Sequence, residues 1–171
     1  MKEEDLRVPK SLTFPLDLGY DNRLLKHFGG SHSATKSFIQ DIVFLSSSYF
    51  KRPSTGLPII TFDIVDIKHY GSIDITADQL CDNKSSRKQT ESKKLRKGKS
   101  TPFVLFVEDM HSRGTSQTTG CAFRGTACNN KDGEAFAIVD MTWRDNRRFA
   151  HVQHMAKTMA HEFGHLVSTH Y

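Results

Sequence analysis

Apolar and polar positions along the chain predict several strands. Residues 14–20 place an apolar side chain at every second position, and this period of two is typical of a strand with one buried face. Residues 57–68 are rich in isoleucine, valine and phenylalanine and predict a buried strand. Shorter runs predict three further strands, at residues 103–107, 121–124 and 134–139.

A spacing of three and four residues replaces the period of two in other regions. From Ala34 onward this spacing predicts an amphipathic helix of about four turns, which follows a predicted loop over residues 21–33. A last helix is predicted from an N-cap at Asp145 to about Val167. The order strand, helix, strand, polar helix-compatible segment, three strands and helix predicts an α/β (α+β) fold with helices packed on a mixed sheet.

The predicted C-terminal helix has two different faces. Successive residues of a helix are about 100° apart, so the position of each side chain around the axis follows from the sequence. His154, His161 and His165 lie within about 40° of one another on one side. The opposite arc, about 100° wide, predicts the core-facing side and carries Phe149, Val152, Ala156, Met159, Ala160, Phe163 and Val167.

The histidine face contains an H-E-x-x-H motif, His161-Glu162-Phe163-Gly164-His165. Side chains at i and i+4 are neighbours on a helix, so the two imidazoles can bind one zinc ion at about 2.0–2.1 Å. The glutamate can take the proton of a zinc-activated water and pass it to a leaving amine, which is the chemistry of a metalloprotease. The alternative is a charged helix face that spells the motif by chance.

Two histidines are too few for a catalytic zinc site, which normally has three protein ligands and a water. His154 shares the histidine face but lies seven residues before His161, about 10 Å along the helix axis. We therefore expect His154 to be a surface or cleft-wall histidine. A third ligand is sought in residues 166–171, directly after the motif.

The motif and its surroundings resemble a known family. The helix motif is similar to that of the metzincins, whose signature continues as H-E-x-x-H-x-x-G-x-x-H. Residues 120–128 (GCAFRGTAC) are similar to the G-x-A-[YF]-x-G-x-x-C stretch of reprolysin-type (adamalysin) metalloproteases, which include snake-venom, ADAM, ADAMTS and tick salivary enzymes. Residues 137–140 and 14–21 resemble strands of the same fold, so the resemblance covers most of the chain.

The resemblance implies a zinc-dependent metalloendopeptidase that hydrolyses protein substrates. It implies a mixed, mostly parallel sheet with an antiparallel edge strand, packed by long helices, with the active-site helix at the C-terminus. His161, His165 and His170 would bind Zn²⁺, and Glu162 would be the general base. An extended peptide would lie along an edge strand formed by the expected substrate-binding residues Gly120, Cys121, Ala122, Phe123 and Arg124.

The sequence departs from the family signature after His165. Ser168 stands where the signature has glycine, and the position of its last histidine holds Tyr171, with His170 one residue earlier. His170 is the expected third ligand, Tyr171 is the alternative, and loss of the third ligand stays open. Because the family continues past this point, we expect residues 1–171 to form a single, incomplete catalytic domain.

The charge of the chain is concentrated in one segment. The formal net charge is +5, but residues 84–99 carry +7 and the rest of the chain carries −2. This segment predicts a solvated loop or insertion, with binding to an anionic polysaccharide as the functional alternative. It has no interleaved aromatic residues, so nucleic-acid binding is not expected.

Residues 1–12 are expected to be a tail, and no run of 18 apolar residues predicts a membrane span.

Three cysteines, Cys81, Cys121 and Cys128, fit either three thiols or one disulfide with a leftover thiol. In the resembling family the cysteine at the position of Cys128 usually pairs with a cysteine downstream of the helix, and these 171 residues contain none there. Cys81 is therefore the more attractive partner for either Cys121 or Cys128, and a Cys121–Cys128 disulfide also stays open. The resemblance implies a secreted monomer, although the N-terminus shows no signal peptide. The alternative functions are a catalytically impaired binding or decoy module and, below it, a polyanion binder acting through residues 84–99.

Overall fold

The structure of the chain is a computed structural model. It describes residues 10–51, 59–73, 94–95, 101–108, 120–122, 135–141 and 151–167. Residues 1–9 of the predicted tail lie outside the described residues, and so does the basic segment 84–99 except for Lys94 and Leu95. The last part of the predicted tail over residues 1–12 is described, and Ser11 and Leu12 belong to the first strand, β1 (Ser11–Tyr20).

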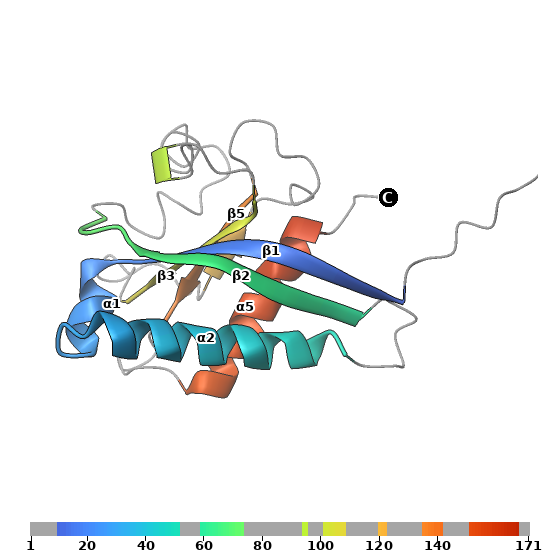
Figure 1. Cartoon of the computed structure of the whole chain (residues 1–171), viewed down its shortest axis with the longest axis horizontal. Coiled ribbons are helices and arrows are strands. Elements are labelled where there is room, and N and C mark those ends of the chain that lie inside the picture. The colour runs from blue at the N-terminus through green and yellow to red at the C-terminus, as the bar shows by residue number, and fades with distance from the viewer. Residues whose placement is uncertain are drawn as a thin grey trace, which may run out of the picture.

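One twisted sheet forms the centre of the fold (Figure 1). Its strands lie in the order β2-β1-β3-β5-β4. The first four are parallel, and β4 pairs with β5 in the antiparallel direction at one edge. The mixed, mostly parallel sheet with an antiparallel edge strand is thus confirmed. The strands are β1 (Ser11–Tyr20), β2 (Ile59–His69), β3 (Phe103–Val107), β4 (Gly120–Ala122) and β5 (Phe136–Asp140).

The two central strands β3 and β5 are buried along their whole length. Alternate side chains of β3 belong to two different hydrophobic clusters, with Val104 and Phe106 in one and Phe103 and Leu105 in the other. Because successive side chains of a strand point to opposite faces, the sheet is covered on both sides here. A continuous apolar run in the sequence is the expected signature of such a strand.

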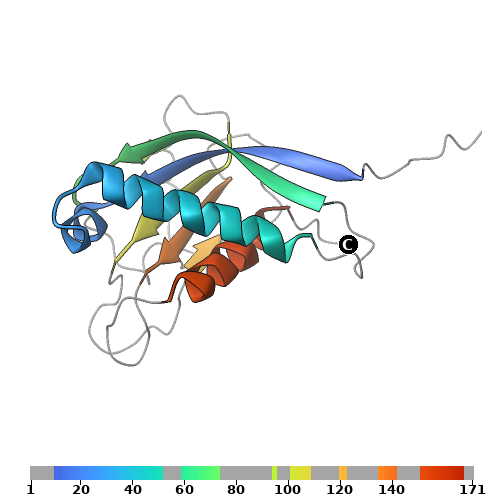
Figure 2. The same ribbon diagram turned by 60° about the horizontal axis from the view of Figure 1, so that its bottom comes forward.

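The helices α2 (His32–Tyr49) and α5 (Val152–Val167) lie side by side on one face of the sheet (Figure 2). Both were predicted from their spacing of apolar residues. The Ser46 hydroxyl of α2 donates to the Ala156 carbonyl of α5 at 2.9 Å and joins the two helices. Since α5 carries the H-E-x-x-H motif, this contact helps to fix the motif relative to the rest of the core.

The prediction of a loop over residues 21–33 is wrong in part, because this segment contains the short helix α1 (Asn22–His27). Buried Asp21 is its N-cap and accepts a hydrogen bond from the Leu24 amide at 2.9 Å. The helix is followed by Gly29 and Gly30, whose φ angles of 62° and 82° suit glycine. A helix of six residues is too short to show a spacing pattern in the sequence.

The predicted start of the last helix at Asp145 is also wrong. His151 is not helical, and α5 begins at Val152. The His151 side chain acts as a cap, because its Nδ1 accepts a hydrogen bond from the Gln153 amide at 3.4 Å. Asp145 itself lies outside the described residues.

Candidate active site

The motif helix α5 is anchored by the aromatic residue inside the motif. The Phe163 ring is fully buried and makes edge contacts with Phe14 of β1 and Phe62 of β2, at centroid distances of 5.2 and 4.6 Å. It also contacts Phe50, which follows α2, at 6.1 Å. This residue lies between Glu162 and Gly164, so its packing fixes the rotation of the helix and the direction of its neighbours.

The buried arc of α5 is about 200° wide, twice the predicted width. The helix packs against α2 on one side and against β4 and β5 on the other, so two flanks are covered instead of one. His161 is exposed and His165 is half-buried, as the predicted histidine face requires. The buried residues are Met155, Ala156, Thr158, Met159, Ala160, Glu162, Phe163 and Leu166.

The two motif histidines face each other. Their Nε2 atoms are 3.0 Å apart, and their rings meet edge to face with centroids 4.6 Å apart and an interplanar angle of 85°. Two ligands of a tetrahedral zinc ion at about 2.0–2.1 Å are themselves about 3.3 Å apart. The separation of the His161 and His165 nitrogens therefore fits two ligands of one ion with an adjustment of a few tenths of an ångström.

Glu162 lies about 60–100° around the axis of α5 from the two motif histidines and is only 5% exposed. Its carboxylate lies against the backbone of β4 at Gly120, as shown by the position that a Cβ atom at this glycine would take, 2.9 Å from Glu162 Oε1. The burial of this carboxylate was not predicted from the sequence. A signal was present, since the stretch that resembles the protease family begins with glycine at this position.

The predicted substrate-binding residues are described in part. Gly120, Cys121 and Ala122 form β4, which ends the strand order beside β5. All three are half-buried, and Cys121 is disulfide-bonded. Its candidate partners Cys81 and Cys128 lie outside the described residues. The predicted residues Phe123 and Arg124 lie outside them as well.

The predicted third ligand is not among the residues that the structure describes, because both His170 and Tyr171 follow the last described residue, Val167. Within the described ranges, no group of three histidine, cysteine, aspartate or glutamate side chains could hold a metal ion. His154, about two turns before the motif, is half-buried. The structure thus places two of the three predicted ligands, and the role of His170 stays a prediction.

A second histidine pair, which sequence reasoning missed, lies around Tyr20. The Tyr20 hydroxyl and His32 Nδ1 form a hydrogen bond of 2.7 Å, and His69 Nε2 donates to Asn22 Oδ1, also at 2.7 Å. The two imidazole centroids are 5.2 Å apart. Burial raises the pKa of the Tyr20 hydroxyl above its usual value of 10.0. No sequence motif links these residues, because they come from β1, α1, α2 and β2.

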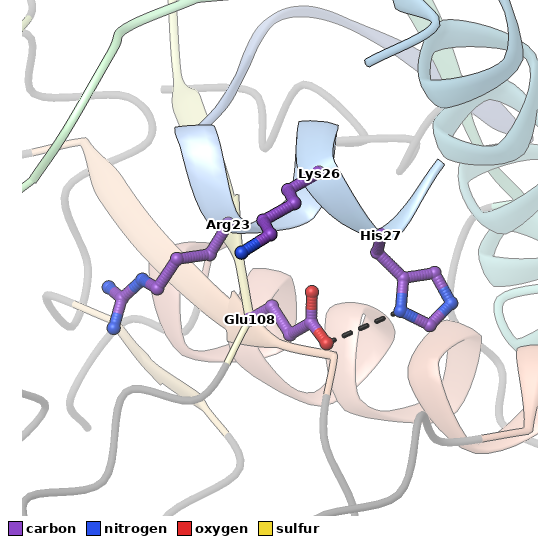
Figure 3. A pocket seen from close by; sticks show the side chains of 4 residues that line it. All are labelled: Arg23, Lys26, His27 and Glu108. Carbon is purple, nitrogen blue, oxygen red and sulfur yellow. Dashed lines mark hydrogen bonds and ion pairs between the residues drawn. The ribbon is translucent and has the colours of Figure 1, made fainter. Parts of the chain in front are cut away.

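A cavity of about 420 Å³ lies elsewhere, at α1 and the end of β3 (Figure 3). Its described lining is Arg23, Lys26, His27 and Glu108 and contains none of the motif residues. Arg23 pairs with Asp21 at 2.9 Å, and His27 Nδ1 lies 3.3 Å from Glu108 Oε1. The charges of this pocket are therefore largely compensated by the protein itself.

Comparison with protein families identifies one match. The family model described as metallo-peptidase family M12B, reprolysin-like, matches residues 37–170. This range contains the H-E-x-x-H motif, β4 and most of the sheet. A comparison with curated protein sequences finds no match.

Two solved structures share the fold. Metalloproteinase-II from Bacteroides fragilis aligns with 94% of this chain and 44% of its own, at 18% identity and a TM-score of 0.50. A chain in the structure of a chaperone–substrate complex aligns with 92% of this chain and 23% of its own, at 14% identity and a TM-score of 0.54. This chain therefore spans less than half the length of both. At these identities the likeness shows the fold alone.

Proposed function

The chain belongs to the reprolysin-like metallopeptidases of family M12B, and we propose from this premise that it is a zinc-dependent endopeptidase acting on proteins. One observation carries the proposal. Two imidazole nitrogens, His161 Nε2 and His165 Nε2, face each other at 3.0 Å, and the carboxylate between them in sequence is buried beside an edge strand. These residues would supply two of the three protein ligands and the carboxylate that metal-assisted peptide hydrolysis uses.

The zinc site would use His161 and His165, with His170 as the third protein ligand. The separation of the two described nitrogens fits a shared zinc ion, and neutral imidazole is a common zinc ligand. When bound, zinc supplies a Lewis acid that makes a water molecule more acidic and polarises the carbonyl group of the substrate.

Glu162 would move the proton. It follows a proposed ligand directly, so its carboxylate can reach a water molecule held near the two imidazoles. The carboxylate would accept the proton of the attacking water and then donate it to the nitrogen of the leaving amine. Its burial against β4 supports this role, because a packed side chain keeps one position.

The substrate would lie along β4. This strand is the last in the sheet order and runs antiparallel to β5, so an extended peptide can extend the sheet beyond it. Gly120, Cys121 and Ala122 would contribute main-chain hydrogen bonds there, and Phe123 and Arg124 would continue the same edge. Main-chain pairing of this kind is largely independent of the side chains of the substrate.

The proposed site of action is outside the cell. Reprolysin-like proteins are typically extracellular, and the disulfide at Cys121 suits an oxidising compartment. Among the described residues, no helix is both long and apolar enough to cross a membrane. Binding of residues 84–99 to an anionic polysaccharide and a monomeric state stay predictions.

The substitution Glu162→Gln tests the proposed role of the carboxylate. Removing a general base typically lowers the rate by about 10²–10⁴-fold. We expect kcat for a fluorogenic protein substrate to fall by this amount, while one zinc ion per chain remains bound. Zinc content is measured by atomic absorption on the purified chain.

Two outcomes would contradict the proposal. Zinc lost together with activity would mean that Glu162 holds the metal or its surroundings instead of moving a proton. Wild-type protein that binds zinc tightly and cleaves no substrate would instead be the binding or decoy module that the departures after His165 allow.

A further inference from the structure

The main chain of β4 passes directly beside the carboxylate of Glu162. A Cβ atom built on Gly120 would lie 2.8 Å from Glu162 Cγ, 2.9 Å from Glu162 Oε1 and 2.8 Å from the Ile138 carbonyl oxygen. Real Cβ atoms essentially never come this close to other heavy atoms. The space that a side chain would occupy at Gly120 is therefore filled by Glu162.

Backbone conformation does not explain this glycine. The described glycines with a positive φ are Gly29, Gly30 and Gly71, and Gly120 is not one of them. Its main chain is that of an ordinary strand, paired with Val139 of β5. What the position requires is the absence of a side chain.

We propose that Gly120 is a positioning residue for Glu162. Because Gly120 has no side chain, the glutamate side chain can lie against the main chain of β4. In this position the carboxylate is shielded from solvent. The catalytic part of this inference rests on the proposed function, whereas the structural part does not. Glu162 remains the group that touches the reacting atoms, and Gly120 acts only through it.

The carboxylate could not easily move aside. The close contact involves Cγ, which is the second side-chain carbon, as well as the terminal oxygen. Its shift requires rotation near the base of the side chain, on a helix whose direction is fixed by the packing of Phe163 against β1 and β2. The other contact, Ile138 O, belongs to the backbone of the central strand next to β4.

The motif supplies a matched control at Gly164. This glycine lies two residues after Glu162 on the same helix, and a Cβ atom added there would meet nothing within 4 Å. Alanine is a better helix former than glycine. Gly164→Ala therefore introduces the same methyl group without the contact.

A double-mutant cycle on the full chain tests the inference without any need for activity. The four proteins are the wild type, Gly120→Ala, Glu162→Ala and the double variant, and the readout is the urea midpoint of unfolding. We expect Gly120→Ala to lower the midpoint and the loss to shrink to about half or less when Glu162 is alanine. Gly164→Ala should leave the midpoint unchanged or raise it.

Each result of the cycle decides the question. A double variant that folds when Gly120→Ala does not would support the inference, because removal of the glutamate side chain restores the space. An equal loss of midpoint in both backgrounds would overturn it, and so would failure of both variants to fold. In either case the Ile138 carbonyl contact alone would account for the glycine.

Kinetics test the catalytic part. A reactive group misplaced by about 1 Å can lose about 10²-fold in rate. We expect Gly120→Ala to lower kcat about ten- to hundredfold, with zinc content unchanged and with little change in KM. A raised KM at unchanged kcat would show that the added methyl group disturbs only peptide docking along β4, and it would overturn the positioning role. A wild type without activity would defeat the proposed function and leave the cycle as a valid test.

Discussion

Two histidine pairs in this protein have similar ring geometry and different surroundings. The rings of His161 and His165 meet at 85° with centroids 4.6 Å apart, and those of His32 and His69 meet at 68° with centroids 5.2 Å apart. In the first pair, two nitrogens face each other at 3.0 Å on the exposed side of one helix. In the second, one nitrogen of each ring forms a hydrogen bond of 2.7 Å with a residue outside the pair, Tyr20 or Asn22.

The difference shows that ring proximity is a poor indicator of a metal site. A metal ligand needs a nitrogen lone pair directed at the ion, and His69 Nε2 instead holds a proton that it donates to Asn22. Asn22 is held in turn, because its amide group donates to the Ser72 hydroxyl at 2.9 Å. The second pair therefore belongs to a hydrogen-bonded cluster that joins β1, β2, α1 and α2.

The largest expected effect comes from removing one histidine from each pair. We expect His161→Ala to lose bound zinc and peptidase activity together, because two remaining ligands are too few for a catalytic site. The loss in zinc affinity should exceed the 10–100-fold that removal of an outer-shell partner typically costs. Zinc content is measured after dialysis against a weak chelator, and activity with a fluorogenic protein substrate.

The matched variant is His69→Ala, in which the second pair loses a ring. We expect this protein to keep its zinc and its activity and to lose only stability. The comparison of the two pairs would be broken by a His69→Ala protein that no longer binds zinc, or by a His161→Ala protein that retains it.

The first pair was predictable from the sequence and the second was not, for a geometric reason. His161 and His165 are four residues apart on one helix, so their proximity follows from the helix itself. His32 and His69 are brought together only by the packing of α2 against β2, and no local pattern encodes that contact. The same reason explains why the burial of Glu162 was missed, since it depends on β4, about 40 residues earlier in the chain.

The fold was predicted wherever an element carried a long pattern. The strand β1 and the helices α2 and α5 follow from apolar periodicity, and β2, β3 and β5 follow from runs of apolar residues. The short strand β4 was expected at residues 121–124, and the mixed sheet was implied by the family resemblance. The failures concern short or capped segments. Asp21 starts a helix of one to two turns, and the His151 imidazole caps α5 where the sequence indicated Asp145. Caps are local side-chain choices among several suitable residues, so the sequence alone does not select between them.

Loss of the disulfide at Cys121 should have the next largest effect. It should affect the pair His161 and His165 and leave the pair His32 and His69 unchanged. Cys121 lies on β4 directly after Gly120, which contacts Glu162, whereas the described residues around His32 and His69 include no cysteine. Removing a native disulfide typically costs about 2–5 kcal/mol. We expect Cys121→Ser to lower the free energy of unfolding by this amount and to lower kcat, as measured by urea unfolding and by protease assay.

Peptide mapping of the unreduced protein identifies the partner as Cys81 or Cys128. A Cys121→Ser protein with unchanged kcat would show that β4 keeps its place without the disulfide. The proposed link between β4 and the position of Glu162 would then rest on the packing at Gly120 alone.

The smallest expected effect concerns Tyr20, at the centre of the hydrogen-bonded cluster that contains His32 and His69. Tyr20→Phe removes a buried hydroxyl that forms a hydrogen bond with His32, at a typical cost of about 0.5–1.5 kcal/mol. We expect this loss at neutral pH with no change in zinc content or kcat. A change in zinc content would show that the two histidine pairs are coupled.

The pH dependence of this small effect provides a sharper test. Because burial raises the pKa of the Tyr20 hydroxyl above 10.0, the folded protein holds this proton more tightly than the unfolded chain does. The stability that the neutral hydroxyl contributes is complete below pH 10 and is lost as the pH rises through the folded-state pKa.

Phenylalanine cannot ionise, and the other three tyrosines are common to both proteins. The difference in the free energy of unfolding between wild type and Tyr20→Phe should therefore narrow above about pH 10. A constant difference from pH 7 to pH 11 would show that the Tyr20 hydroxyl titrates alike in the folded and unfolded protein.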